Sequence, residues 1–211
     1  CRKLIQKLEK ILEKEENFDI KCNLEILRFE IYAFLGILRE FEKDLEKFNK
    51  TVQDSGFEKI LPKIKLLQEK VCLERSDTES ATVILKEVLQ SAREHSNKFI
   101  EAVAKNRLLG LGELEFREIE DSVEYAKMQN LSWLLLEIYA NLILRGKREY
   151  LSEIKKIMEK SENKISNYKV KLRLSHLDDG FRKDSERILK DIREEVERIN
   201  LHFNPKIYEG K

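Results

Sequence analysis

The chain has 211 residues, and 38% of them are charged. Its 41 lysines and arginines nearly balance its 40 aspartates and glutamates, which leaves a formal net charge of +1. This balance excludes a global basic field, so nucleic-acid binding would need a local basic patch. The scarcity of proline and glycine favours long helices, and the abundance of Lys, Glu, Ile and Leu is typical of hyperthermophile proteins.

Signals for targeting and for metal binding are missing from the residue pattern. We see no signal peptide and no apolar run of the roughly 20 residues that a membrane span needs, so we expect a cytoplasmic protein without membrane contact. The cysteines and histidines are scattered, without disulfide or metal-ligand spacing. They are Cys1, Cys22, Cys72, His95, His176 and His202. We therefore predict neither a bound metal nor another cofactor.

The first two predicted helices differ in how strongly the pattern supports them. Residues 1–15 are amphipathic, and a loosely attached N-terminal helix within 1–19 is one interpretation. The segment 20–50 is predicted to be one long helix, because its apolar residues alternate steps of four and three in a heptad seam. These are Ile20, Leu24, Leu27, Ile31, Phe34, Leu38, Phe41, Leu45 and Phe48.

A second apolar stripe covers another face of the first half of this long helix. Its residues are Cys22, Ile26, Phe29, Ala33 and Ile37. A helix that is apolar on two faces is expected inside a bundle, so we predict that the first half is buried on both faces. The second half should be exposed on one side.

Further helices are predicted from caps and periodicity. Their ranges are 62–72, 78–110, 131–144, 148–166 and 183–202, with a polar helix or connector over 113–128. The segment 131–144 should be the most buried, since Glu137 is its one charge. We find no internal repeat. The prediction is an all-α, single-domain antiparallel bundle of about seven or eight helices over residues 1–211.

Glu137 stands out because every close neighbour in the sequence is apolar. A buried carboxylate is costly unless it is paired or coordinated. We therefore expect an ion pair with an Arg or Lys from another helix, or an interface position. A catalytic or metal-binding role is the alternative.

Basic residues gather on both sides of a predicted turn at Gly180. They are Lys169, Lys171, Arg173, Arg182, Lys183 and Arg187. Tyr168 and Phe181 lie nearby in the sequence and could stack on bases, which indicates a candidate nucleic-acid-binding patch. Solubilising side chains on a thermophile-like surface would give the same pattern.

Four short segments resemble the translin family, which includes translin and the translin-associated factor. The first is Lys98-Phe99-Ile100-Glu101-Ala102, followed about 23 residues later by Tyr125, where the family begins its apolar central helix. The others are Arg145-Gly146, Ile157-Met158-Glu159, and Leu177–Arg182 with the helix after it. The resemblance covers roughly residues 95–200.

This resemblance implies a seven-helix protomer that assembles into a hollow oligomer and binds single-stranded RNA or DNA. Nuclease-active members hold Mg²⁺ with a carboxylate cluster. Here Lys98 replaces the first Glu of that cluster and only Glu101 remains. Aligned from Gly146, the two acids of the family's central helix fall on Asn130 and Leu134. Aligned from Tyr125, they fall on Leu131 and Leu135. Both carboxylates are lost in either alignment. The resemblance therefore favours binding over cleavage.

Three functional hypotheses follow. The first is a translin-like, oligomeric single-stranded nucleic-acid-binding protein without nuclease activity. The second is a structural or adaptor protein whose seam packs against helices of a protein partner or of further copies. The third is a Mg²⁺-dependent endoribonuclease in which Glu101 and Glu137 form a metal pair that Glu94 or Glu124 completes. Only this third hypothesis needs a cofactor.

Overall fold

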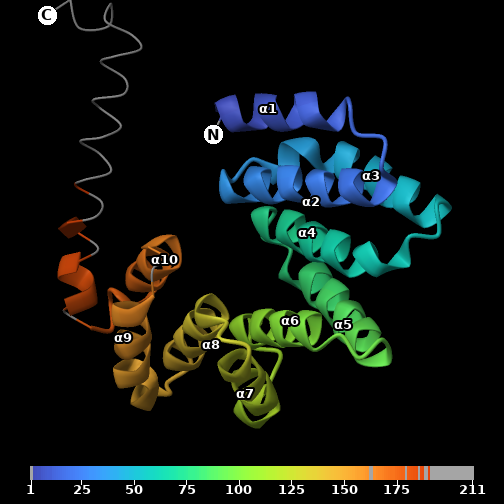
Figure 1. Cartoon of the computed structure of the whole chain (residues 1–211). Coiled ribbons are helices and arrows are strands. Elements are labelled where there is room, and N and C mark those ends of the chain that lie inside the picture. The colour runs from blue at the N-terminus through green and yellow to red at the C-terminus, as the bar shows by residue number, and fades with distance from the viewer. Residues whose placement is uncertain (1, 162–163, 179, 185, 188–189, 191–211) are drawn as a thin grey trace, which may run out of the picture. The chain divides into compact units, whose positions relative to one another are not determined.

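The computed structural model describes residues 2–161, 164–178, 180–184, 186–187 and 190. These residues contain helices and no strand, which confirms the all-α prediction, and none of the helices is long and apolar enough to cross a membrane. The α-helices in Figure 1 are α1 (Arg2–Leu12), α2 (Phe18–Phe34), α3 (Glu42–Asp54), α4 (Leu61–Glu74), α5 (Thr78–Glu94), α6 (Lys98–Leu111), α7 (Glu120–Met128), α8 (Ser132–Leu144), α9 (Leu151–Lys160) and α10 (Lys164–Leu174). Short 3₁₀ helices cover Leu38–Phe41, Glu58–Ile60, Phe116–Ile119 and Arg148–Tyr150.

Helices α2 to α8 all end in the same way. Each is followed by a residue with a positive φ, between 53° and 97°. These residues are Gly36, Gly56, Ser76, Ser96, Gly112, Asn130 and Gly146. At every one of them the N–H donates to the carbonyl three residues back, and the next N–H donates to the carbonyl five residues back. This pair of hydrogen bonds is the Schellman motif, which satisfies the last carbonyls of a helix and turns the chain.

The positions of these turns repeat along the chain. Gly36, Gly56, Ser76 and Ser96 are twenty residues apart, which gives 40 residues for a pair of helices. Later, the steps from Ser96 to Asn130 and from Gly112 to Gly146 are both 34 residues. Periods of about 34 to 47 residues are found in α-solenoids built from helix pairs. Between Gly36 and Gly146 the turns therefore recur at regular spacings that residue identities do not reveal.

Two predicted long helices are wrong because of these turns. The segment 20–50 is broken at Gly36, whose φ of 69° cannot belong to a right-handed helix. The segment 78–110 is broken at Ser96, after which the Asn97 side chain caps α6 by accepting from the Ile100 N–H at 3.1 Å. The segment 148–166 likewise ends early, since Ser161 after α9 is extended. Most of the predicted helix 183–202 lies outside the described residues.

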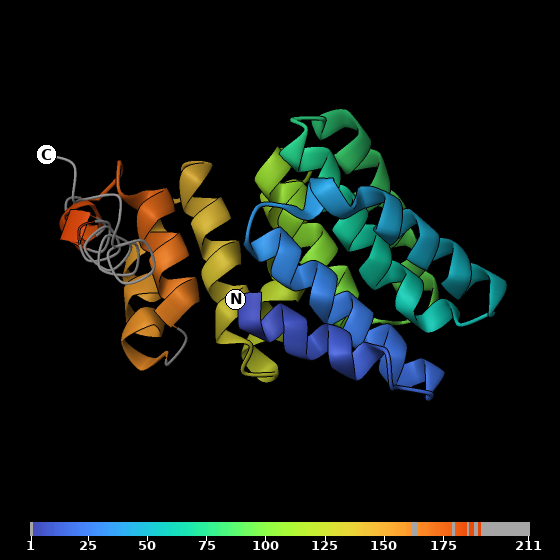
Figure 2. The same cartoon turned by 90° about the horizontal axis from the view of Figure 1, so that it is seen from above.

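The chain divides into two compact units, Cys1–Tyr125 and Ala126–Lys211. In the first unit α4 packs against α2, α3, α5 and α6, and α1 lies alongside α2 in both views (Figures 1 and 2). Part of its core is one cluster from α2, α3, α4 and the 3₁₀ turns between them. Its buried residues are Cys22, Ile26, Phe29, Tyr32, Leu38, Leu45, Val52, Ile60, Ile64, Leu67 and Val71. That residues 1–211 form a single domain stays a prediction.

The second unit is organised around α8, which packs against α9 and α10. Nine of the thirteen residues of α8 are buried, among them Leu134, Ile138 and Tyr139. The prediction that 131–144 is a buried helix is therefore confirmed. Tyr139 also stacks on Tyr150 with ring centroids 4.9 Å apart, which joins α8 to the 3₁₀ turn before α9.

Gly36→Ala should lower the free energy of unfolding by about 1–2 kcal/mol, because a Cβ disfavours the left-handed conformation that the turn requires. Beyond Gly36 and its two chain neighbours, no atom lies within 4 Å of the added carbon, so the effect would come from the backbone alone. Gly110→Ala within α6 is the matched control and should raise stability by roughly 0.5–1 kcal/mol. Urea unfolding measures both. A Gly36→Ala variant as stable as wild type would contradict the left-handed turn.

Candidate functional site

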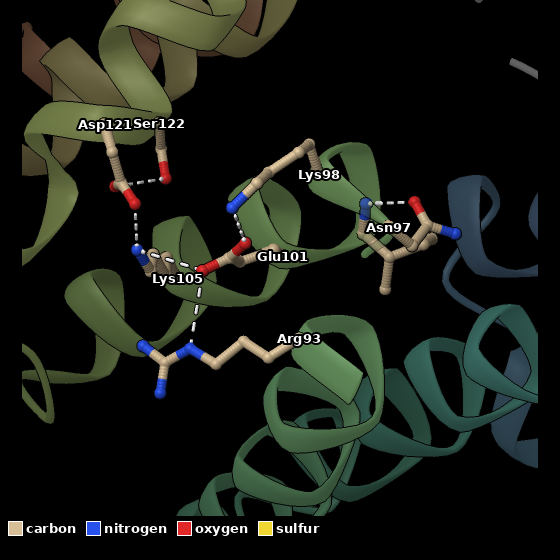
Figure 3. Close-up of polar contacts among 8 residues, drawn as sticks. Arg93, Asn97, Lys98, Glu101, Lys105, Asp121 and Ser122 are labelled. Carbon is tan, nitrogen blue, oxygen red and sulfur yellow. Dashed lines mark hydrogen bonds and ion pairs between the residues drawn. The ribbon is translucent and has the colours of Figure 1, made fainter. Parts of the chain in front are cut away.

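The Glu101 carboxylate lies among three cations (Figure 3). Glu101 is in the first turn of α6 and is only 5% exposed. It accepts from Lys98 Nζ at 2.9 Å, and Lys105 Nζ and Arg93 Nε lie 3.3 Å and 3.4 Å from its Oε1. Lys98 and Lys105 are three residues before and four residues after Glu101, so helical spacing puts them on its face. Arg93 comes from the last turn of α5.

Lys105 extends this network to α7. Its side chain is almost fully buried, and its Nζ donates to Asp121 Oδ2 at 2.6 Å as well as contacting Glu101. Ser122 Oγ donates to the other Asp121 oxygen at 3.3 Å. The buried lysine therefore bridges two carboxylates, one on α6 and one on α7, while Arg93 contributes from α5 (Figure 3). Three helices are held together by one set of charges.

The electrostatics of Glu101 fit a structural role. Burial would raise the pKa of its carboxyl, but hydrogen bonds from Lys98, Lys105 and Arg93 outweigh burial and hold the pKa below its usual range. The carboxylate is thus ionised and already satisfied. Mg²⁺ is held by several oxygen ligands, and in the described part of the chain no three His, Cys, Asp or Glu side chains come together to hold a metal. Glu94 and Glu124 therefore do not complete a site with Glu101.

Glu137, the other predicted acid, has its own partner in the second unit. It lies on α8 and accepts from Arg173 Nη1 of α10 at 2.7 Å. Arg173 Nη2 also donates to the buried Asn141 Oδ1. The Glu137 side chain is about a quarter exposed, which is less buried than its apolar neighbours suggest. The predicted ion pair with an Arg from another helix is confirmed.

The candidate nucleic-acid-binding residues lie in the second unit, and several of them contact acids. Arg173 pairs with Glu137, while Lys171 donates to Asp184, whose second oxygen lies 3.6 Å from Arg187 Nη2. The hydrogen bond from Lys171 lowers the pKa of Asp184. Lys169, Arg182 and Lys183 are exposed. Part of the positive charge is therefore matched within the protein, which weakens the local field.

Of the two aromatic residues expected to stack on bases, only Phe181 has a described side chain. It is 4% exposed, and Lys155 Nζ lies 5.2 Å from its ring centroid. A ring this buried is not available to a base, so the stacking expectation is wrong for Phe181. The side chain of Tyr168 lies outside the described part of the chain.

A second buried ion pair was not predicted at all. Glu69 of α4 is 1% exposed and pairs with Arg107 of α6, whose Nη1 also donates to the Leu66 carbonyl at 2.9 Å. Burial raises the pKa of Glu69, against the opposing effect of Arg107. Nothing in the sequence marks these two residues among the many acids and bases. The spacing of Glu101 and Lys105, in contrast, is a recognisable helical ion pair.

Helix α2 has two apolar faces with opposite environments. The stripe that contains Cys22, Ile26 and Phe29 is buried in the core of the first unit. On the other face Ile20, Leu27 and Phe34 are 48%, 45% and 55% exposed, and Leu24 and Ile31 between them are half-buried. We call this exposed row the α2 seam, which consists of Ile20, Leu24, Leu27, Ile31 and Phe34.

This result reverses the prediction for the heptad seam. The first half was expected to be buried on both faces, yet its heptad residues are the exposed ones. The second half contributes the buried Leu38 and Leu45 to the core, because Gly36 turns the chain back. The exposed half of the predicted heptad seam is therefore the first half, which forms α2.

A cavity of about 420 Å³ in the first unit offers no clear chemistry. Its apolar lining includes Leu61, Val88 and Ala92, and its charged lining includes Lys59 and Lys65. Both lysines already pair with acids at 3.0 Å and 2.8 Å, Asp19 and Glu87 respectively. The cavity therefore has no excess charge that would select a ligand class.

Glu101→Gln should lower the free energy of unfolding by about 1–3 kcal/mol near neutral pH, because it removes the charge that Lys105 and two further cations share. The folded-state pKa of Glu101 is lowered, so its contribution is present above the ordinary carboxyl pKa and is lost as the pH falls through the folded value. The difference from wild type should shrink in acid. Urea unfolding at several pH values measures it.

The control for this experiment is Glu94→Gln on the exposed end of α5, which should change stability by less than about 0.5 kcal/mol. Mg²⁺ should stabilise neither protein. If Mg²⁺ stabilised the wild type and not the Glu101→Gln variant, a metal site at Glu101 would replace the structural interpretation.

Arg173→Met should destabilise the second unit by roughly 1–2 kcal/mol, because Glu137 and Asn141 both lose their partner. Lys183→Met, at an exposed neighbour, should change stability by less than about 0.5 kcal/mol. Thermal unfolding compares the two. Equal effects would mean that Arg173 is a surface cation and is open to a ligand.

The chain was compared with models of known families, with curated proteins and with solved structures, and none of them matches it. These comparisons neither support nor oppose the resemblance to the translin family, which stays a prediction.

Proposed function

We propose that this chain is a helical structural or adaptor protein that acts through protein–protein contacts made by the α2 seam. One observation carries the proposal: Ile20, Leu27 and Phe34 form a row of large apolar side chains that are each close to half exposed. They are seven residues apart, so they project from the same side of α2. Scattered apolar side chains are normal on a protein surface, but a continuous row is typical of an interaction site.

The seam also has the spacing that helical recognition uses. Ile20, Leu24, Leu27, Ile31 and Phe34 provide apolar groups at intervals of four and three residues, the pattern by which one helix packs against another. The opposite face of α2 is fixed by Ile26 and Phe29 in the core. A partner would therefore meet a preformed surface, which reduces the entropy lost on binding.

Single-stranded nucleic-acid binding is a weaker proposal on this geometry. It would depend on the basic residues on both sides of Gly180, and three of these, Lys171, Arg173 and Arg187, already have acidic partners. Filter binding at low and high salt tests it, because phosphate contacts make retention salt-sensitive. The endoribonuclease hypothesis has less support still, since Glu101 and Glu137 each have cationic partners in separate units.

A photoreactive phenylalanine analogue placed at Leu27 tests the adaptor proposal in an extract of the source cells. We expect a discrete cross-linked adduct that disappears when Ile20 and Phe34 are both changed to Gln. The matched control has the same analogue at Val83, an exposed apolar residue of α5, and should give no such adduct. Failure of Leu27 to cross-link, or the same adducts from both positions, would count against the proposal.

A further inference from the structure

We draw no further inference here: the strongest candidate, the exposed apolar face of α2 along Ile20, Leu27 and Phe34, already carries the proposed function, and nothing in the part of the chain that the structure describes shows what covers it.

Discussion

The structure depends on a backbone constraint that recurs at the end of seven helices. After each of α2 to α8 one residue adopts a left-handed conformation, and two hydrogen bonds close the turn. At Gly36 this turn divides the heptad pattern between two helices. The part that follows contributes Leu38 and Leu45 to the core, while α2 buries its other stripe and leaves the seam open. The exposed surface on which the proposed function rests is thus a consequence of where the chain turns.

Buried charges then fix the helices that the turns connect. The Glu101 network joins α5, α6 and α7, and the Glu69–Arg107 pair joins α6 to α4. Such pairs add little net stability over apolar packing, but an unpaired member is strongly destabilising, so they favour a particular alignment of neighbouring helices. The same reasoning explains why Glu101 resembles a catalytic acid in the sequence and not in the structure. Its partners use the lone pairs that a metal would need.

Much of the fold could be predicted from the sequence, and the failures have physical reasons. The apolar run that became α8 was recognisable because hydrophobicity acts locally, and so was the start of the helix predicted over 62–72, because a proline fits the first turn of α4. The break at Ser96 was not, since a left-handed serine has no distinctive signal and neighbouring apolar residues keep the helical period. The choice between the two stripes of α2 was also out of reach, because both have helical spacing and only tertiary packing decides which is buried. The partner of Glu137 was predictable as a type, while its identity as Arg173 depends on α10.

Helix α2 buries one apolar face and presents the other to solvent. Hydroxyl-radical footprinting of the dilute protein, with modification located by mass spectrometry, measures this side chain by side chain. We expect strong modification of Leu27 and Phe34 and protection of Phe29 and Ile26. Equal protection of both faces in the dilute protein would contradict this orientation of α2, because the seam would then be part of the core and unavailable to any partner.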